Sequence, residues 1–322
     1  MVNRDIKERV TVIGTGTMGH SIALSIAWAS MPVTMYGVNR DDIEKGMKSI
    51  EEKVTLLIEN DLLSEEGGEQ IIRNITPSTE LREALQDTTF VIEAAPEQLE
   101  FKQDLFRDME IICSEEVILA SNTSSLKPTD ISQKLEFPDR MVVVHFWNPA
   151  HLLPLVEVVK GEHTTEQTVE RAMSLLDYIG KKAIRVEKEV LGFVGNRLQY
   201  ALFREAQYLY EEGVASIEDI DTAVHTSIGR RLGETGPFLT ADMGGLDVFS
   251  AISDYVFPDL SKDKKSLPNL QKLVSEGSYG QKSGKGYYRW DKDFHLSMSK
   301  NRDKELIRWM KKDMERISRE KV

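Results

Sequence analysis

The sequence has little cysteine, no long apolar run and no excess of positive charge. Its 322 residues include one cysteine, Cys113, which excludes an internal disulfide and is typical of a reducing compartment such as the cytoplasm. No stretch approaches the ~18 consecutive apolar residues of a membrane-spanning helix, and residues 1–10 lack the apolar core of a secretory signal. The formal net charge of −12 disfavours nucleic acids and anionic membranes as partners. We therefore expect a cytoplasmic globular protein, long enough for two domains, whose partner is a small molecule.

Strand-like and helix-like segments alternate through about the first 190 residues. Short apolar runs bounded by Gly, Pro, Ser or Asn are typical of buried parallel strands. They lie at residues 9–14, 32–37, 88–95, 115–121, 140–146 and 153–159. Between them, residues 97–113 place Leu105, Phe106 and Met109 on one face of a helix. This alternation predicts an α/β fold with a Rossmann-type, doubly wound sheet.

The remaining patterns suggest how the chain is divided. Residues 42–75 are longer than one ordinary crossover helix, and we interpret them as two helices joined around Glu66–Gly68. After GFVGNR the strand pattern disappears and helical patterns follow, one of them starting at a capping box of Ser216 and Asp219. The sequence predicts a Rossmann domain over residues 1–189 and an all-α domain over residues 190–322. In such folds the ligand binds at the carboxyl ends of the strands, beside the second domain.

A glycine-rich turn follows the first apolar run, with Gly14, Gly16 and Gly19 in the spacing G-x-G-x-x-G. In a dinucleotide-binding turn the first glycine permits the tight turn, the second lets the pyrophosphate approach the backbone, and the third lets the helix pack on the strand. The helix that begins there, at Thr17 and Met18, directs its free amides at the phosphates. Because an apolar strand precedes the motif and an apolar helix follows it, dinucleotide binding is favoured over an ordinary glycine-rich loop.

Further along, seven motifs resemble in their order those of L-3-hydroxyacyl-CoA dehydrogenases. They are VIEAAPE, ASNTSSL, HFWNP, LVEVV, GFVGNR, GPF…D…GLD and GQKSGKGYY. The resemblance extends from about residue 8 to residue 290 and includes relatives that act on free L-3-hydroxy acids, of the L-gulonate (lambda-crystallin) and L-carnitine dehydrogenase types. It implies an NAD(P)-dependent oxidoreductase of fatty acid metabolism that interconverts a short L-3-hydroxyacyl-CoA, such as 3-hydroxybutyryl-CoA, and the 3-ketoacyl-CoA. It also implies a homodimer.

His145 and Glu157 form the expected catalytic pair. Oxidising a secondary alcohol needs a base for the hydroxyl proton, and histidine suits this task near neutral pH. Glu157, on the next strand-like run, would orient the imidazole of His145 and stabilise its protonated form. The resemblance implies that Ser124 hydrogen-bonds the substrate oxygen and that Asn196 contacts the same region from the second domain. Plainer alternatives are a core histidine, a turn cap at Ser124 and a helix cap at Asn196.

The resemblance also implies residues that bind the cofactor outside the glycine-rich turn. Asn148 is expected near the nicotinamide ribose. The other matched positions are Glu97, Lys102, Asn122 and Lys282. Lys282 has a plainer explanation as one lysine of a solvated loop. We expect no metal site.

The acidic residue that closes the second strand of an NAD-binding unit is missing. Gly37 occupies its position, and Asn39 and Arg40 precede the first carboxylate, Asp41. Loss of the carboxylate removes repulsion toward a 2′-phosphate, which Arg40 would attract, as in NADP-binding units. Asn39 would instead hydrogen-bond a ribose hydroxyl. We expect NAD, with NADP left open.

The acyl-CoA half of the substrate is open as well. In the family, the helices after the second strand supply polar and basic groups to the CoA, but here their lysines are interleaved with glutamates, as on a solvated face. A free L-3-hydroxy acid of the carnitine or gulonate kind is therefore the alternative substrate. The 3-hydroxyisobutyrate and 6-phosphogluconate type of dehydrogenase does not fit, because the helix that follows GFVG lacks its lysine. A non-catalytic dinucleotide-binding protein is a third interpretation, which the Ser, His, Glu and Asn set disfavours.

Overall fold

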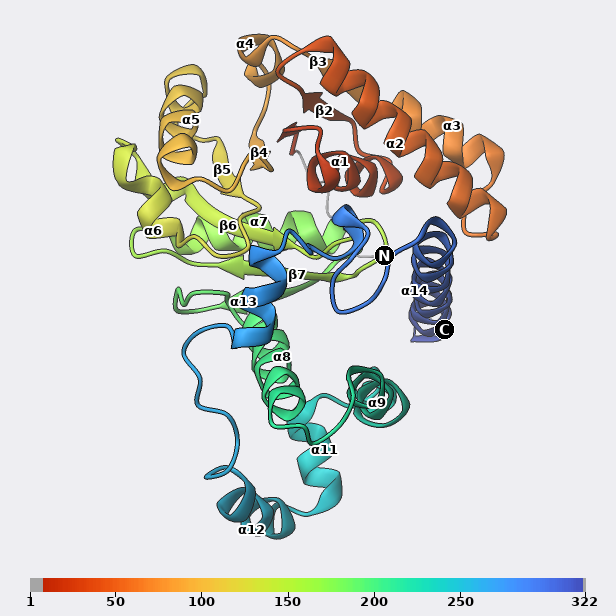
Figure 1. Ribbon diagram of the computed structural model, residues 1–322. Coiled ribbons are helices and arrows are strands. Elements are labelled where there is room, and N and C mark those ends of the chain that lie inside the picture. The colour runs from red at the N-terminus through yellow and green to blue at the C-terminus, as the bar shows by residue number, and fades with distance from the viewer. Residues whose placement is uncertain (1–7, 321–322) are drawn as a thin grey trace. The chain divides into compact units, whose positions relative to one another are not determined.

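The computed structural model describes residues 8–320, which separate into two compact units (Figure 1). The first unit contains the described residues up to Asn196 together with those from Asn301 onward. The second unit contains Arg197–Lys300. The division of the domains at residue 189 stays a prediction.

The first unit is built around an eight-stranded sheet in the order β3-β2-β1-β4-β5-β6-β7-β8. The strands are β1 (Val10–Ile13), β2 (Val33–Tyr36), β3 (Ile75–Ser78), β4 (Phe90–Glu93), β5 (Ile118–Ser121), β6 (Met141–Phe146), β7 (Leu155–Val159) and β8 (Lys182–Val186). Neighbouring strands pair in parallel except β6 and β7, which are antiparallel. The predicted Rossmann-type α/β fold is confirmed.

All six apolar runs form strands, whereas the sequence analysis missed the two edge strands, β3 and β8. Pro77 lies within β3, where proline is tolerated because one side of an edge strand needs no N–H donor. In β8 only Val186 is buried. An edge strand that is half exposed carries too weak an apolar pattern to be recognised by composition.

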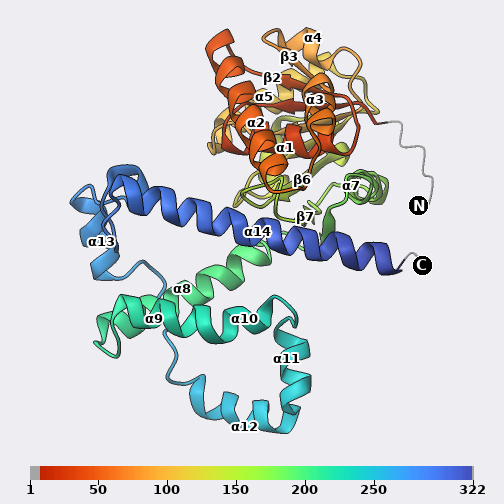
Figure 2. The same ribbon diagram turned by 90° about the vertical axis from the view of Figure 1, so that its right-hand side faces the viewer.

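Helices cover both faces of this sheet (Figures 1 and 2). They are α1 (Thr17–Trp28), α2 (Arg40–Glu59), α3 (Glu65–Arg73), α4 (Leu81–Leu85), α5 (Leu99–Ile112), α6 (Pro128–Ile131) and α7 (Glu166–Tyr178), with short 3₁₀ turns at Ser132–Lys134 and Pro138–Arg140. Helices α1, α2, α3 and α7 share one hydrophobic core with the sheet, and α4, α5 and α6 share another. The carboxyl ends of the parallel strands are left free to carry the site.

The position of the turn between α2 and α3 was predicted wrongly. The turn lies at residues 60–64, and Gly67 and Gly68 are inside α3, whose N-cap Ser64 accepts a hydrogen bond from the Gly67 amide at 3.1 Å. A Cβ atom on Gly68 would lie 2.8 Å from a methyl of Val54. Glycine is therefore needed here for the close approach of α3 to α2, and not for a turn.

The second unit is helical. Its elements are α8 (Gly195–Glu211, beginning in the first unit), α9 (Ile217–Ala223), a π-helical turn (Val224–Ile228), α10 (Gly229–Leu232), α11 (Pro237–Gly244), α12 (Leu246–Val256), α13 (Pro268–Ser275), a 3₁₀ turn (Gln281–Ser283) and the start of α14 (Lys292–Glu320). The predicted capping box is confirmed, since the Asp219 amide donates to Ser216 Oγ at 3.1 Å.

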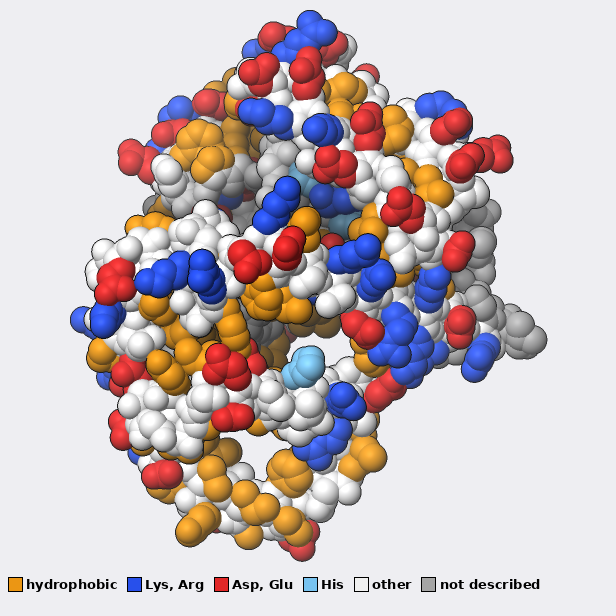
Figure 3. All heavy atoms as spheres, turned by 45° about the vertical axis from the view of Figure 1, so that its right-hand side comes forward, with side chains coloured by type: hydrophobic (Ala, Val, Ile, Leu, Met, Phe, Trp, Pro, Cys, Tyr) orange, Lys and Arg blue, Asp and Glu red, His pale blue; other side chains and the backbone are white. Residues whose placement is uncertain are grey.

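This second unit has no hydrophobic core of its own. None of the hydrophobic residues of Arg197–Lys300 is buried, and Phe238 and Tyr255 are 88% and 86% exposed. Apolar side chains are accordingly prominent on its surface (Figure 3). An apolar surface of this extent is typical of a region that another protein covers.

The later part of α14 belongs to the first unit. Ile307, 3% exposed, packs with Leu57 of α2 and Leu152, and Leu306 and Met310 extend the contact. The apolar end of α2 is thereby covered by the chain itself.

Candidate active site

The antiparallel pairing of β6 with β7 brings the predicted pair together. In this register His145 lies directly opposite Glu157. The distance between His145 Nδ1 and Glu157 Oε2 is 2.8 Å, and the two side chains are 8% and 0% exposed. Because side chains on paired strands share one face of the sheet, the register alone determines that they meet.

Glu157 accepts hydrogen bonds from three further groups. Its Oε1 accepts the backbone amides of Val194 and Gly195 at 2.9 and 3.0 Å, and its Oε2 also accepts Trp147 Nε1 at 3.2 Å. Burial alone would raise the pKa of the Glu157 carboxyl, but the bonds from His145, Gly195 and Val194 together lower it. The carboxylate therefore stays ionised beside the imidazole.

His145 is held by this carboxylate in one orientation. An ionised Glu157 only accepts, so Nδ1 of the neutral ring carries the hydrogen and Nε2 keeps a lone pair. The rings of Trp147 and Phe193 lie with their centres 5.7 and 5.6 Å from the imidazole and restrict its rotation. A Cβ atom on Gly195 would lie 2.4 Å from the Trp147 ring, which explains the glycine there. This arrangement has the form of a general base with its orienting acid.

Ser124 and Asn196 lie next to each other. Asn196 Nδ2 donates to the backbone oxygen of Ser124 at 3.2 Å, and the Ser124 amide donates to Glu97 Oε1 at the same distance. Asn196 lies in the first turn of α8 and still within the first unit. The three residues are thus assembled at the loop that follows β5.

The two asparagines predicted to bind the cofactor, Asn122 and Asn148, have different surroundings. Asn122 Oδ1 accepts the backbone amide of Phe146 at 2.8 Å, so it ties the end of β5 to the residue after His145. Asn148 is exposed in the turn after β6, before a cis peptide bond to Pro149. Asn122 therefore holds the end of β6 beside β5, whereas Asn148 is exposed.

The glycine-rich turn has the geometry of a phosphate-binding turn. Gly14 has φ +110°, and a Cβ atom on Gly19 would lie 2.0 Å from the Gly14 oxygen. Around Gly16, by contrast, no atom lies within 4 Å of such a Cβ. Helix α1 begins at Thr17 and Met18 without a side-chain cap, so no side-chain acceptor occupies its first amides. These features fit the pyrophosphate of a dinucleotide.

At the end of β2 the residues are packed against the same turn. A Cβ atom on Gly37 would lie 2.9 Å from a Thr15 methyl and 3.0 Å from Ile43, which explains why no carboxylate occupies this position. Asn39 caps α2 by accepting the Asp42 amide at 2.9 Å. Arg40 pairs with Glu44 at 3.2 Å on the surface. Such an exposed pair is weak, and the guanidinium is free to bind another anion.

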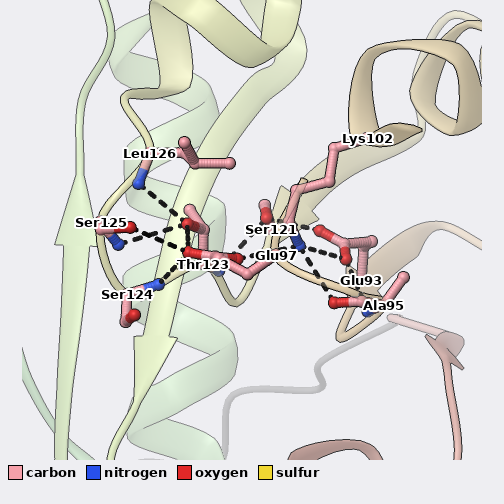
Figure 4. A network of polar contacts seen from close by, with 9 residues as sticks. All are labelled: Glu93, Ala95, Glu97, Lys102, Ser121, Thr123, Ser124, Ser125 and Leu126. Carbon is pink, nitrogen blue, oxygen red and sulfur yellow. Dashed lines mark hydrogen bonds and ion pairs between the residues drawn. The ribbon is translucent and has the colours of Figure 1, made fainter. Parts of the chain in front are cut away.

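Lys102 and Lys282 are placed in different units. Lys102 is 1% exposed, and its Nζ contacts Glu93 Oε1 at 2.5 Å and Glu97 Oε2 at 3.4 Å (Figure 4). Its cofactor role stays a prediction, but its ammonium is already engaged by two carboxylates. Lys282 lies in the second unit, with its Nζ 5.3 Å from the centre of the Tyr279 ring.

The sequence analysis missed Glu93, Trp147 and the amides of residues 194 and 195 as parts of the site. Glu93 was recognisable in principle, because it is a charged residue at the end of a fully buried strand. The backbone donors were not, because they follow Gly192 and Phe193 at φ +75° and +48°, and a positive φ is not expected of phenylalanine.

Two other histidines are buried near the glycine-rich turn. His151 Nδ1 lies 2.9 Å from Ser21 Oγ, and His20 Nδ1 lies 3.1 Å from the Thr15 oxygen. Burial, with added repulsion from Lys53, Lys181 and His20, lowers the pKa of His151 to about 3. His151 is therefore neutral in the folded protein near neutral pH.

We expect the free energy of unfolding to fall as the pH is lowered from 6.5. The unfolded chain binds a proton at residue 151 below pH 6.5, whereas the folded protein does not until about pH 3. The contribution of His151 approaches ~1.4 kcal/mol per pH unit in this window. Urea denaturation at several pH values, on the wild type and on His151→Gln, measures it. An equal slope in both proteins would contradict the expectation.

Comparison with known proteins identifies the family. Residues 9–190 match the NAD-binding domain of 3-hydroxyacyl-CoA dehydrogenase, and residues 192–290 match its C-terminal domain. The chain belongs to the 3-hydroxyacyl-CoA dehydrogenase family. It is thus an oxidoreductase of the dehydrogenase type with an NAD-binding domain, as the resemblance implied.

Individual members of this dehydrogenase family are similar over nearly the whole chain. A 5-formyl-3-hydroxy-2-methylpyridine 4-carboxylate 5-dehydrogenase of Mesorhizobium japonicum is 33% identical over 92% of this chain and 96% of its own. A probable 3-hydroxybutyryl-CoA dehydrogenase of Bacillus subtilis is 35% identical over 88% and 98%. A crystal structure of a dehydrogenase of the same pyridine carboxylic acid, described as an NAD+-dependent dismutase, superimposes with a TM-score of 0.86 at 33% identity, over 94% of this chain and 97% of that one.

Within residues 8–320 of this dehydrogenase, no helix combines the length and the apolar character needed to cross a membrane.

Proposed function

We propose that this dehydrogenase interconverts a 3-hydroxyacyl group and the corresponding 3-ketoacyl group by hydride transfer to NAD. The observation that supports this most is the pairing of His145 with the buried, ionised Glu157. The pair lies in the same sheet as the strand β1 that leads into the glycine-rich turn. A base with one free nitrogen and a turn suited to pyrophosphate are the two parts that an alcohol dehydrogenation requires.

In the oxidative direction, His145 Nε2 takes the proton of the substrate hydroxyl while the hydrogen on the same carbon leaves as hydride. NAD, when bound, accepts that hydride at its nicotinamide ring. Glu157 stabilises the imidazolium that forms, and Trp147 and the amides of Val194 and Gly195 keep Glu157 in place. We assign Ser124 and Asn196 to hold the substrate oxygen beside His145.

We assign the other predicted cofactor residues in the same way. Thr17 and Met18 present amides to the pyrophosphate, and Glu97, Asn122 and Asn148 line the loops at the strand ends near the nicotinamide half. Asn39 and Arg40 adjoin the adenosine ribose, where neither a carboxylate nor a dedicated phosphate site is built. Lys102 acts through Glu97, and the cofactor role of Lys282 stays a prediction.

For the substrate we propose a short-chain 3-hydroxyacyl-CoA, in line with the Bacillus relative. A second candidate is a free carboxylic acid that carries the reacting group. It is favoured by the Mesorhizobium relative, which is named for a pyridine carboxylate, and by α14, which covers Leu57 of α2. Helix α2 is one of those from which the family resemblance led us to expect contacts to CoA.

One experiment separates these candidates. We expect the purified protein to reduce acetoacetyl-CoA with NADH, at a kcat/KM at least about tenfold higher than with NADPH or with free acetoacetate. Steady-state rates for the four combinations give the comparison. Turnover of free acetoacetate alone would select the second candidate. NADH binding without turnover of either substrate would overturn the proposed reaction and favour a structural dinucleotide-binding role.

We also propose that a second copy of the chain covers the apolar helices of the second unit. Residues Phe238, Met243 and Tyr255 are more than 70% exposed, and the unit has no buried apolar residue with which to stabilise itself. An identical surface on a second copy supplies the missing core through an isologous interface. Sedimentation velocity should show a dimer, and a monomer at micromolar concentration would contradict it.

A further inference from the structure

Glu93 is the buried centre of a polar network that the proposed reaction does not use directly. It is the last residue of β4 and is 0% exposed. Its Oε1 accepts the Ala95 amide at 2.6 Å and Lys102 Nζ at 2.5 Å, and its Oε2 accepts Ser121 Oγ at 2.5 Å (Figure 4). With these donors and no exposure, the carboxylate has no access to a ligand.

The three donors come from three different segments. Ala95 lies in the turn after β4, Lys102 in α5, and Ser121 at the end of β5, where the parallel register places it beside Glu93. One carboxylate therefore fixes the relative positions of two strand ends and a helix. All of these segments adjoin the loop of residues 121–126.

Two branches lead from Glu93 to that loop. Through Ser121, whose Oγ accepts the Thr123 amide at 3.2 Å, Glu93 reaches the loop directly. Through Lys102, whose Nζ lies 3.4 Å from Glu97 Oε2, it reaches Glu97. Glu97 Oε1 in turn accepts the amide of Ser124 at 3.2 Å and the hydroxyl of Thr123. The branches meet at Thr123, next to the residue assigned to the substrate oxygen.

The ion pairs of Lys102 show what the Glu93 carboxylate contributes to the network. Lys102 is buried between Glu93 and Glu97, so two carboxylates share one ammonium. Burial would raise the pKa of Glu97, but the hydrogen bond from Thr123 and the charge of Lys102 keep it low. Replacing the Glu93 carboxylate by an uncharged side chain would remove the buried partner of Lys102, and the ammonium would be drawn toward Glu97 and away from its present position.

We infer that Glu93 is a positioning residue for the reaction, which holds Lys102 against Glu97 and so fixes the loop that presents Ser124. The inference rests on the proposed function for its effect on turnover, but the effect on the loop is independent of it. A purely structural Glu93 would stabilise the fold without changing the loop or the kinetics selectively.

The test compares Glu93→Gln with Glu110→Gln. Glu110 is a matched control, because only 9% of its side chain is exposed and it is ion-paired to the buried Arg140 and bonded to two backbone amides, but it lies outside the network. We expect both variants to be destabilised. Only Glu93→Gln should speed amide hydrogen exchange in residues 121–126 and lower kcat/KM for the hydroxyacyl substrate, by about 10- to 100-fold.

A double variant, Glu93→Gln/Lys102→Met, removes both buried charges. It should recover stability relative to Glu93→Gln while its kcat stays low, which a purely structural role does not predict. Unchanged exchange in residues 121–126 of Glu93→Gln would overturn the inference, as would kinetics equal to those of Glu110→Gln. Faster exchange in a protein whose wild type turns over no substrate would instead overturn the proposed function and leave the positioning of the loop intact.

Discussion

His145→Ala should lower kcat by about 10²–10⁴-fold and leave NADH binding within a few-fold of wild type. The imidazole of His145 is oriented by Glu157, because the distance between Nδ1 and the carboxylate is 2.8 Å. Its other nitrogen, Nε2, can therefore accept the proton of the substrate hydroxyl. Cofactor binding depends on the turn after β1, which His145 does not form. Steady-state kinetics together with NADH fluorescence titration measure the two quantities.

Glu157→Gln is the companion variant. The amide retains the size of the carboxylate but not its charge, so the imidazolium loses its stabilising partner and kcat should fall as well. Because His145 and Glu157 act as one unit, the double variant should lose little more than His145→Ala alone. A kcat of His145→Ala within about tenfold of wild type would contradict the proposed mechanism.

The second large effect is expected at the third glycine of the turn. Gly19→Ala would place a Cβ atom 2.0 Å from the backbone oxygen of Gly14, a distance that real atoms do not adopt. Helix α1 must then move away from the glycine-rich turn. The amides at the start of the helix would no longer point at the pyrophosphate. We expect NADH affinity to fall by more than about 100-fold and the melting temperature to drop.

Gly16→Ala is the matched control for this change. Its Cβ atom meets nothing within 4 Å, so folding should be normal. Its methyl nevertheless projects over the open side of the turn, and a moderate loss of NADH affinity, about tenfold, is expected there. Isothermal titration and thermal melts on both variants distinguish the two. If Gly19→Ala melts and binds like wild type, the close approach of α1 to the turn is not required.

Buried strands and the glycine-rich turn are predictable from the sequence because their signals are local. A run such as that around β6 is largely apolar, and Gly19 is explained by its contact with Gly14, five residues earlier. The pairing of His145 with Glu157 was also predictable, although only through the order of the motifs and their resemblance to a family.

What was missed depends on contacts between distant segments. Gly68 has the composition of a turn, but it is explained by its distance to Val54 on another helix. The amides that anchor Glu157 follow two residues with positive φ, Gly192 and Phe193, and the residue type gives no indication of it at the phenylalanine. Likewise, an asparagine at position 39 is a residue type that could hydrogen-bond a ribose, but its side chain also caps α2 by accepting the Asp42 amide.

The absence of a buried apolar residue from the second unit has a thermodynamic consequence. Without a core, the helices of this unit gain little from the hydrophobic effect within one chain, and the dimer proposed above would supply the missing burial. In the dimer proposed above, folding and dimer formation are one linked equilibrium, in which the melting temperature rises with protein concentration. Dilution would act on this protein as a denaturant does on a monomer.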